Sequence, residues 1–237
     1  MQWLVHHHHR EAGEAPATHT RGHVLNWWGW VYDLLARFGM RFILGGSEHA
    51  LRQTTADLAQ LQPGEAVLDV GCGTGTLAMV ARLRVGETGS VTGIDPSVQL
   101  LTRARRKAAR RGLEINFQLG VIEQLPFPDQ SFDVVLSTLM MHHLPDDLKR
   151  QGLVEIARVL KPGGRLLVVD VRRAEEHHDQ PAQLVGQWNS GIQDQPALMK
   201  EAGFSQIEAG ETPFRGRLAF REGLGFALGR KSLAEDC

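Results

Sequence analysis

Short apolar runs alternate with longer amphipathic stretches over most of the chain. The apolar runs predict five strands, at residues 66–71, 90–95, 115–120, 132–138 and 164–171. The stretches between them place apolar residues three or four positions apart and predict helices at residues 77–85, 97–112 and 146–160. Strands that alternate with helices in this way indicate a parallel, doubly wound α/β sheet.

The two ends of this alternating region have weaker patterns. A helix over residues 195–203 and strands at 204–211 and 223–231 are predicted after it. Two helical patterns precede it, the first at residues 25–40 and the second at 47–61 with Ser47 as its N-cap. The first pattern has a broad apolar stripe that contains Trp27, Trp28 and Trp30.

Three zones follow from these patterns. Residues 1–22 are polar and aperiodic and are expected to form a flexible tail, while residues 23–62 are expected to form a helical lid and residues 63–237 the main domain. The four consecutive histidines at 6–9 have two interpretations, a flexible metal-chelating tract or a linker, and we assign no metal site to them.

Composition narrows the class of protein without naming a partner. The 237 residues include 26 basic and 27 acidic ones, so the formal net charge of -1 favours neither nucleic acid nor an anionic membrane surface. Two cysteines, Cys72 and Cys237, give no disulfide framework or zinc pattern, which fits a cytoplasmic location. No apolar run approaches the roughly 18 residues that would span a bilayer.

The sequence VLDVGCGTGT at residues 67–76 places three glycines directly after the first predicted strand. Such a turn lies at the carboxyl edge of an open α/β sheet, where these folds bind ligands. The dinucleotide pattern G-x-G-x-x-G fails because Thr76 occupies its third glycine position. Asp95 ends the second strand, where a carboxylate can accept both hydroxyls of a ribose, and Asp69 precedes the glycines. The two acids suit a nucleoside with an amine-bearing tail.

Four ordered blocks resemble the class I S-adenosylmethionine-dependent methyltransferases, in particular the branch of the ubiquinone/menaquinone-biosynthesis C-methyltransferases. The blocks are VLDVGCGTG, VTGIDPS, EQLPFPDQSFDVVLS and EIARVLKPGGRLLVVD, and together they cover about residues 64–171. The resemblance implies a Rossmann-like seven-stranded sheet whose last strand is antiparallel. It also implies S-adenosylmethionine as cofactor and methyl transfer to a small-molecule acceptor, with O, N and C acceptor atoms all open.

The resemblance also implies site residues. The glycines would let the backbone approach the methionine portion and the ribose, Asp95 would hold the ribose hydroxyls, and Ser137 would close the other side of the pocket. The cofactor-binding residues expected on this basis are Asp69, Gly71, Gly73, Thr74, Gly75, Asp95, Val121, Ile122 and Ser137.

The chain departs from the family pattern where the adenine is expected. Family members have an acid or amide before the Leu-Pro-Phe loop, but residues 120–122 read Gly-Val-Ile here. The side chain of Val121 cannot form a hydrogen bond. Adenine recognition then depends on the Ile122 N–H, on Glu123 or on apolar contacts with the ring.

Two adjacent histidines are the candidate general bases. His142 and His143 follow the fourth predicted strand at the ligand edge, and histidine titrates near neutral pH. A base is needed only if the acceptor loses a proton. The alternative is that one histidine packs inside the loop while the other faces solvent. His177 and His178, after the fifth strand, lie in a polar stretch that reads as a loop.

Two further features have both a functional and a structural interpretation. The tryptophan-rich helix, with Tyr32, either lines an acceptor pocket for an apolar or aromatic molecule or only packs on the sheet. The basic helix at 103–111 either holds phosphates or is a solvated face, and the second interpretation favours a small molecule over nucleic acid. The alternatives to an enzyme of this kind are a non-catalytic cofactor sensor or assembly factor and, third, a nicotinamide oxidoreductase.

Overall fold

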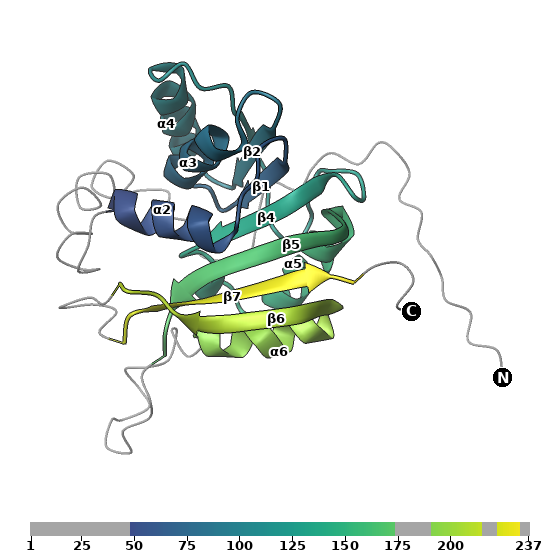
Figure 1. Ribbon diagram of the computed structural model, residues 1–237. Coiled ribbons are helices and arrows are strands. Elements are labelled where there is room, and N and C mark those ends of the chain that lie inside the picture. The colour runs from purple at the N-terminus through teal and green to yellow at the C-terminus, as the bar shows by residue number, and fades with distance from the viewer. Residues whose placement is uncertain (1–47, 174–190, 215–221, 233–237) are drawn as a thin grey trace.

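The computed structural model describes residues 48–173, 191–214 and 222–232 (Figure 1). In that part of the chain seven strands form one sheet in the order β3-β2-β1-β4-β5-β7-β6. The strands are β1 (Ala66–Val70), β2 (Ser90–Asp95), β3 (Asn116–Leu119), β4 (Phe132–Thr138), β5 (Leu160–Val171), β6 (Phe204–Glu211) and β7 (Leu224–Lys231). The first five are parallel, and β7 is antiparallel to both β5 and β6. The predicted seven-stranded Rossmann-like sheet with an antiparallel last strand is confirmed.

Helices cover both faces of this sheet. They are α2 (Glu48–Leu58), α3 (Thr76–Val85), α4 (Val98–Ala109), α5 (Asp146–Val159) and α6 (Gln195–Glu201), with short 3-10 turns η1 (Met141–His143) and η2 (Ile192–Asp194). In Figure 1, α2 lies in front of the sheet and α6 lies behind it. In the described segments, no helix is long and apolar enough to cross a membrane.

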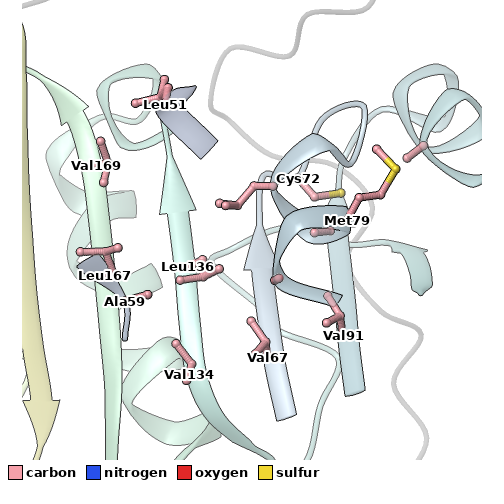
Figure 2. Close-up of a cluster of buried hydrophobic side chains, with 14 of the residues drawn as sticks. Leu51, Ala59, Val67, Cys72, Met79, Val91, Val134, Leu136, Leu167 and Val169 are labelled. Carbon is pink, nitrogen blue, oxygen red and sulfur yellow. The ribbon is translucent and has the colours of Figure 1, made fainter. Parts of the chain in front are cut away.

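Alternation along the strands divides the core into two layers. Val134 and Leu136 of β4 face the layer that contains Leu51 of α2, while Val135 between them faces α5 and α6. Figure 2 shows the first layer, in which side chains from β1, β2, β4 and β5 meet residues from α2 and α3. Because helices cover both faces, the central strands β1 and β4 and the second half of β5 are mostly apolar, whereas the edge strands β3 and β6 are more polar.

The helix boundaries follow the local sequence closely. Ser97 caps α4 by accepting the Leu100 N–H at 3.3 Å, and Gly112 takes a left-handed φ of 63° after the helix ends. The largest boundary error is at β5, which begins at Leu160 instead of residue 164, because Leu160 pairs with Phe132 before a register shift in the β4–β5 ladder. The helices predicted at 97–112 and 47–61 also end three residues earlier, at Ala109 and Leu58.

Several predicted features lie outside the described residues. These are the flexible tail with its four histidines, the tryptophan-rich helix with Tyr32, the Ser47 cap, His177, His178 and Cys237. The second predicted N-terminal helix is described as α2, which buries Leu51, Thr55 and Ala56 against the domain. Part of the predicted lid segment therefore shares the core of the main domain.

Candidate functional site

A cleft lies at the carboxyl ends of the central strands, with about 1060 Å³ of space when the open solvent at its mouth is included. Its walls come from the segments that follow β1, β2, β3 and β4 and from the start of α2. In the sheet order β1 lies between β2 and β4. The connection after β1 leads to β2 on one side of it, whereas β4 lies on its other side and is followed by β5 farther out in the same direction. In open α/β sheets such a reversal of strand order creates a crevice that binds ligands.

The three loop glycines, Gly71, Gly73 and Gly75, all have a positive φ, but a side chain at each of them would meet different surroundings. A Cβ at Gly75 would lie 2.6 Å from the ring of Phe117, and a Cβ at Gly71 would collide with Met140. A Cβ at Gly73 would meet no atom within 4 Å. Gly75 and Gly71 are therefore needed for packing, whereas the space in front of Gly73 belongs to the cleft.

Asp95 holds this glycine loop against the end of β2. One carboxylate oxygen accepts the Gly73 N–H at 3.0 Å and the other accepts the Ser97 N–H at 2.8 Å. Burial raises the pKa of Asp95 above its ordinary value, and the two N–H donors oppose this rise. Each carboxylate oxygen has a second acceptor position, so Asp95 can also receive hydroxyls from the cleft that it lines.

Asp69 is a buried carboxylate at the end of β1. Its side chain is 2% exposed, and its Oδ2 atom has no hydrogen-bond partner. Burial raises the pKa of Asp69 to about 7, and the positive charge of Arg52 and the Ala78 N–H act in the opposite direction. A cationic group in the cleft would satisfy the free oxygen and restore the ionised form.

Unpaired buried polar atoms gather in this cleft. Six such side-chain atoms occur in the described segments, and four of them belong to residues that line the cleft. These four are Arg52 Nε, Asp69 Oδ2, Glu123 Oε2 and Thr138 Oγ1. Because a buried polar group without a partner is unfavourable, a ligand that supplied hydrogen-bond partners to these residues would be favoured.

The structure brings most of the predicted site residues together. Those that line the cleft are Asp69, Gly71, Gly73, Thr74, Asp95, Val121, Ile122 and His143. The Thr74 hydroxyl accepts a hydrogen bond from Lys107 of α4 at 3.1 Å. Gly75 and Ser137 lie beside the cleft without lining it, and Ser137 is fully buried with an unpaired hydroxyl.

The two candidate bases occupy different environments. His143 lines the cleft, whereas the buried His142 places Nδ1 2.5 Å from Asp170 Oδ1. The His142 N–H also donates to the second oxygen of Asp170 at 3.1 Å. The two imidazole rings are 4.0 Å apart between centroids. His143 is therefore the histidine that a bound molecule can reach, while His142 braces the turn against β5.

Several residues that line the cleft were missed from the sequence, among them three polar ones. Glu48 and Arg52 reach the cleft from α2, and Thr138 rather than Ser137 faces it from β4. Alternation along β4 places Thr138 on the face of Val134 and Leu136, but only the structure shows that this face meets the cleft. No sequence motif marks Arg52, because its approach depends on how α2 packs.

Comparison with known proteins relates part of this chain to a protein family. Residues 67–164 match the family described as a methyltransferase domain. The chain is 35% identical over 157 residues to an arsenite methyltransferase of Halobacterium salinarum, which covers 63% of this chain and 40% of that protein. It is 38% identical over 139 residues to a demethylmenaquinone methyltransferase of Thermus thermophilus, with 59% and 60% covered. A ubiquinone/menaquinone biosynthesis C-methyltransferase of Laribacter hongkongensis is 38% identical over 126 residues, with 53% and 51% covered.

The chain thus spans 40% to 60% of the length of these relatives.

Solved structures share its fold at lower identity. A methyltransferase from Aquifex aeolicus, dependent on S-adenosylmethionine, has a TM-score of 0.64 at 20% identity and covers 85% of this chain and 97% of its own. The [4+2]-cyclase SpnF has a TM-score of 0.68 at 22% identity, covering 90% and 99%. One fold therefore accommodates different reactions.

Proposed function

We propose that this chain, through the domain that includes residues 67–164, is a class I S-adenosylmethionine-dependent methyltransferase and transfers a methyl group from S-adenosylmethionine to a small-molecule acceptor. The observation that carries the proposal is the set of unpaired polar atoms in the cleft, which matches the functional groups of that cofactor. S-adenosylmethionine supplies a methyl group on a sulfonium, which is already a good leaving group.

The residues present fit this cofactor. Asp95 has acceptor positions for the ribose hydroxyls, and the open space at Gly73 allows the backbone to approach them. The free oxygen of Asp69 suits the ammonium of the methionine portion, and the unpaired Nε of Arg52 suits its carboxylate. The residues of this chain therefore provide opposite charges for a zwitterionic tail.

Catalysis on this proposal consists mainly of alignment and exclusion of water. The chain holds the two reactants in one cleft, and His143 is the group that would remove a proton when the acceptor must lose one. Residues 23–62 would act as a lid, an idea supported by the position of Glu48 and Arg52 of α2 at the cleft. The role of His142 as a base remains a prediction.

An apolar or aromatic acceptor is favoured by the part of the cleft wall that follows β4. Leu139, Met140 and Leu144 line the cleft there, next to His143. Leu139 has a φ of 56°, an unfavourable conformation for a leucine that is held where the acceptor would lie. The relatives named for demethylmenaquinone act on a molecule of the quinone class, which suits such a wall.

An organic acceptor is also favoured over arsenite. Trivalent arsenic is a soft centre that prefers thiolate ligands. The chain contains Cys72 and Cys237, and burial together with the negative charges of Asp69 and Asp95 raises the pKa of the Cys72 thiol well above its usual value. A thiol of this kind is a poor ligand for arsenic at neutral pH.

We also propose a cytoplasmic location for the protein, which its low cysteine content supports.

The test is a transfer assay with methyl-labelled S-adenosylmethionine and a panel of quinols, phenols and amines. We expect label in a quinol or phenol, together with heat of binding for S-adenosylhomocysteine in a titration. Binding without transfer to any acceptor would favour the alternative, a non-catalytic cofactor sensor or assembly factor. If S-adenosylhomocysteine neither releases heat nor raises the melting temperature of the folded protein, the proposed function is wrong.

Replacing loop glycines by alanine separates binding from folding. Gly73→Ala is expected to lower stability by only ~1 kcal/mol, the penalty of a left-handed alanine, while weakening S-adenosylhomocysteine at least about tenfold because the new methyl group enters the cleft. Gly75→Ala is expected to lower stability by ~3 kcal/mol, since its methyl group also overlaps Phe117. Urea unfolding and calorimetric titration measure the two effects. Equal losses of stability in the two variants would contradict this division of roles.

A further inference from the structure

One residue of the basic helix α4 forms hydrogen bonds with the glycine loop. The Lys107 ammonium donates to the Thr74 hydroxyl at 3.1 Å and to the Thr76 hydroxyl at 2.9 Å. Both threonines line the cleft, and they flank Gly75 in the sequence. A single charged group from a distant helix therefore bridges the loop residues on either side of Gly75.

Packing places α4 against the same part of the loop. A Cβ at Gly75 would lie 3.0 Å from the Cβ of Ala104, which precedes Lys107 by three residues in α4. Residues three apart share a face of a helix, so the close contact from Ala104 and the hydrogen bonds from Lys107 come from one face of α4. The helix is therefore docked on the loop at the point where the half-buried Lys107 reaches it.

The two halves of the loop have different anchors. In the first half, the Cys72 N–H donates to the Ile94 carbonyl at 2.9 Å, which bonds the loop to β2. The Gly73 N–H donates to the Asp95 carboxylate at 3.0 Å, at the end of the same strand. In the described segments, the side-chain hydrogen bonds of the second half, residues 74–76, come from Lys107. Because glycine restricts its backbone little, a loop rich in glycine depends on such anchors to keep one shape.

We propose that Lys107 is a positioning residue that holds the second half of the glycine loop in the conformation that binds the cofactor. The inference rests on the proposed function, since it assumes that S-adenosylmethionine occupies the cleft. Lys107 does not itself line the cleft, so it acts through the two threonines and not by touching the ligand. A loop that has its bound shape before the ligand arrives loses less conformational entropy on binding. Removing the ammonium should therefore weaken binding while the core of the domain stays folded.

The experiment measures S-adenosylhomocysteine binding by calorimetric titration on the purified full-length protein and on two variants that each lose one positive charge from α4. Lys107→Met keeps an unbranched side chain without the ammonium and is expected to bind at least about fivefold more weakly than the unmodified protein. Its melting temperature without ligand should fall by no more than about 4 °C. Arg106→Met is the matched control, since it removes an exposed charge outside the cleft, and it should bind within about twofold of the unmodified protein.

Two further variants separate positioning from a general loss of structure. Lys107→Arg restores a positive charge with several N–H donors, so it should bind about threefold more tightly than Lys107→Met. Thr76→Val removes one of the two hydroxyls and keeps the shape of the side chain, and by itself it is expected to weaken binding about threefold. In the Lys107→Met background it should cause no further loss, because the hydrogen bond that it removes is already absent.

The outcomes distinguish this inference from the proposed function. If folded Lys107→Met binds S-adenosylhomocysteine as tightly as the unmodified protein, or if the losses from Lys107→Met and Thr76→Val add, the inference is overturned and the proposed function stands. Equal weakening in Arg106→Met would also overturn it, because the effect would then be one of overall charge. Should Lys107→Met not fold, weaker binding by Thr76→Val supports the inference and unchanged binding overturns it. If the unmodified protein does not bind S-adenosylhomocysteine, the proposed function fails and this inference fails with it.

Discussion

Replacing Asp95 by alanine is expected to weaken S-adenosylhomocysteine binding on the order of 100-fold or more. The carboxylate would receive two ribose hydroxyls, and hydrogen bonds to a charged group contribute about 1.5–3 kcal/mol each, where 1.4 kcal/mol is a factor of ten. The same oxygens accept the Gly73 and Ser97 N–H groups, so the glycine loop also loses its anchor to β2. Calorimetric titration at constant pH and salt measures the loss directly.

Two further variants interpret the Asp95 result. Asp95→Asn keeps one acceptor oxygen and should fall between the original protein and the alanine variant. Asp129→Ala removes an exposed carboxylate that pairs with Arg158 and does not line the cleft. This control variant should bind S-adenosylhomocysteine as tightly as the original protein does. Unchanged affinity in a folded Asp95→Ala protein would remove Asp95 from the ribose site and with it the main support for a nucleoside ligand.

Replacing Asp69 by asparagine is expected to stabilise the unliganded protein and impair cofactor binding together. The pKa of Asp69 is about 7 in the folded protein against an ordinary value of 3.8, so ionising it opposes folding. At pH 8 this amounts to about 4 kcal/mol at most, at 1.36 kcal/mol per pH unit. Asparagine removes that penalty, but it also removes the negative charge that would pair with the ammonium of the cofactor. Urea unfolding at pH 8 should show Asp69→Asn to be the more stable protein.

The raised pKa of Asp69 also fixes how the stability of the original protein changes with pH. Between pH 3.8 and about 7 the folded protein binds more protons than the unfolded chain at Asp69, so stability falls as the pH rises through this window. The advantage of Asp69→Asn should therefore shrink steadily from pH 7 toward pH 4. Binding runs the other way, because the ammonium needs the ionised acid, so affinity of the original protein should drop by up to about tenfold per pH unit below 7.

Asp69→Asn should lack that pH dependence of binding, which serves as the internal control. A variant that is less stable than the original protein at pH 8, or whose affinity follows the same pH profile, would show that Asp69 is not the buried acid described here. Measurements on both proteins at pH 5, 6, 7 and 8 separate these cases.

The order of strands and helices was predictable because each element carries its own pattern. The apolar runs of β1, β2 and β4 and the three-to-four spacing of α4 and α5 are local features, and burial of both sheet faces makes the runs almost continuous. The start of β5 was not predictable, since it depends on pairing between Leu160 and Phe132, which are distant in sequence.

The candidate site was predictable only in part. The residues after β1 and β2 lie in local motifs, so Asp69, Gly73 and Asp95 were identified before the fold was known. Arg52 comes from a helix that precedes the sheet, and nothing in its neighbourhood along the chain marks it. The choice of Thr138 over Ser137 required knowing which face of β4 meets the cleft.

The amino-acid sequence by itself determined the alternation of elements, the glycine turn and the acids at two strand ends, because short-range spacing and side-chain chemistry specify them. Only the tertiary structure decided which of His142 and His143 faces the cleft and which glycine opens onto it. It alone also left Glu123 with a buried, unpaired oxygen. Such properties arise when segments far apart in the chain pack together, so they depend on distances in space that no local pattern contains.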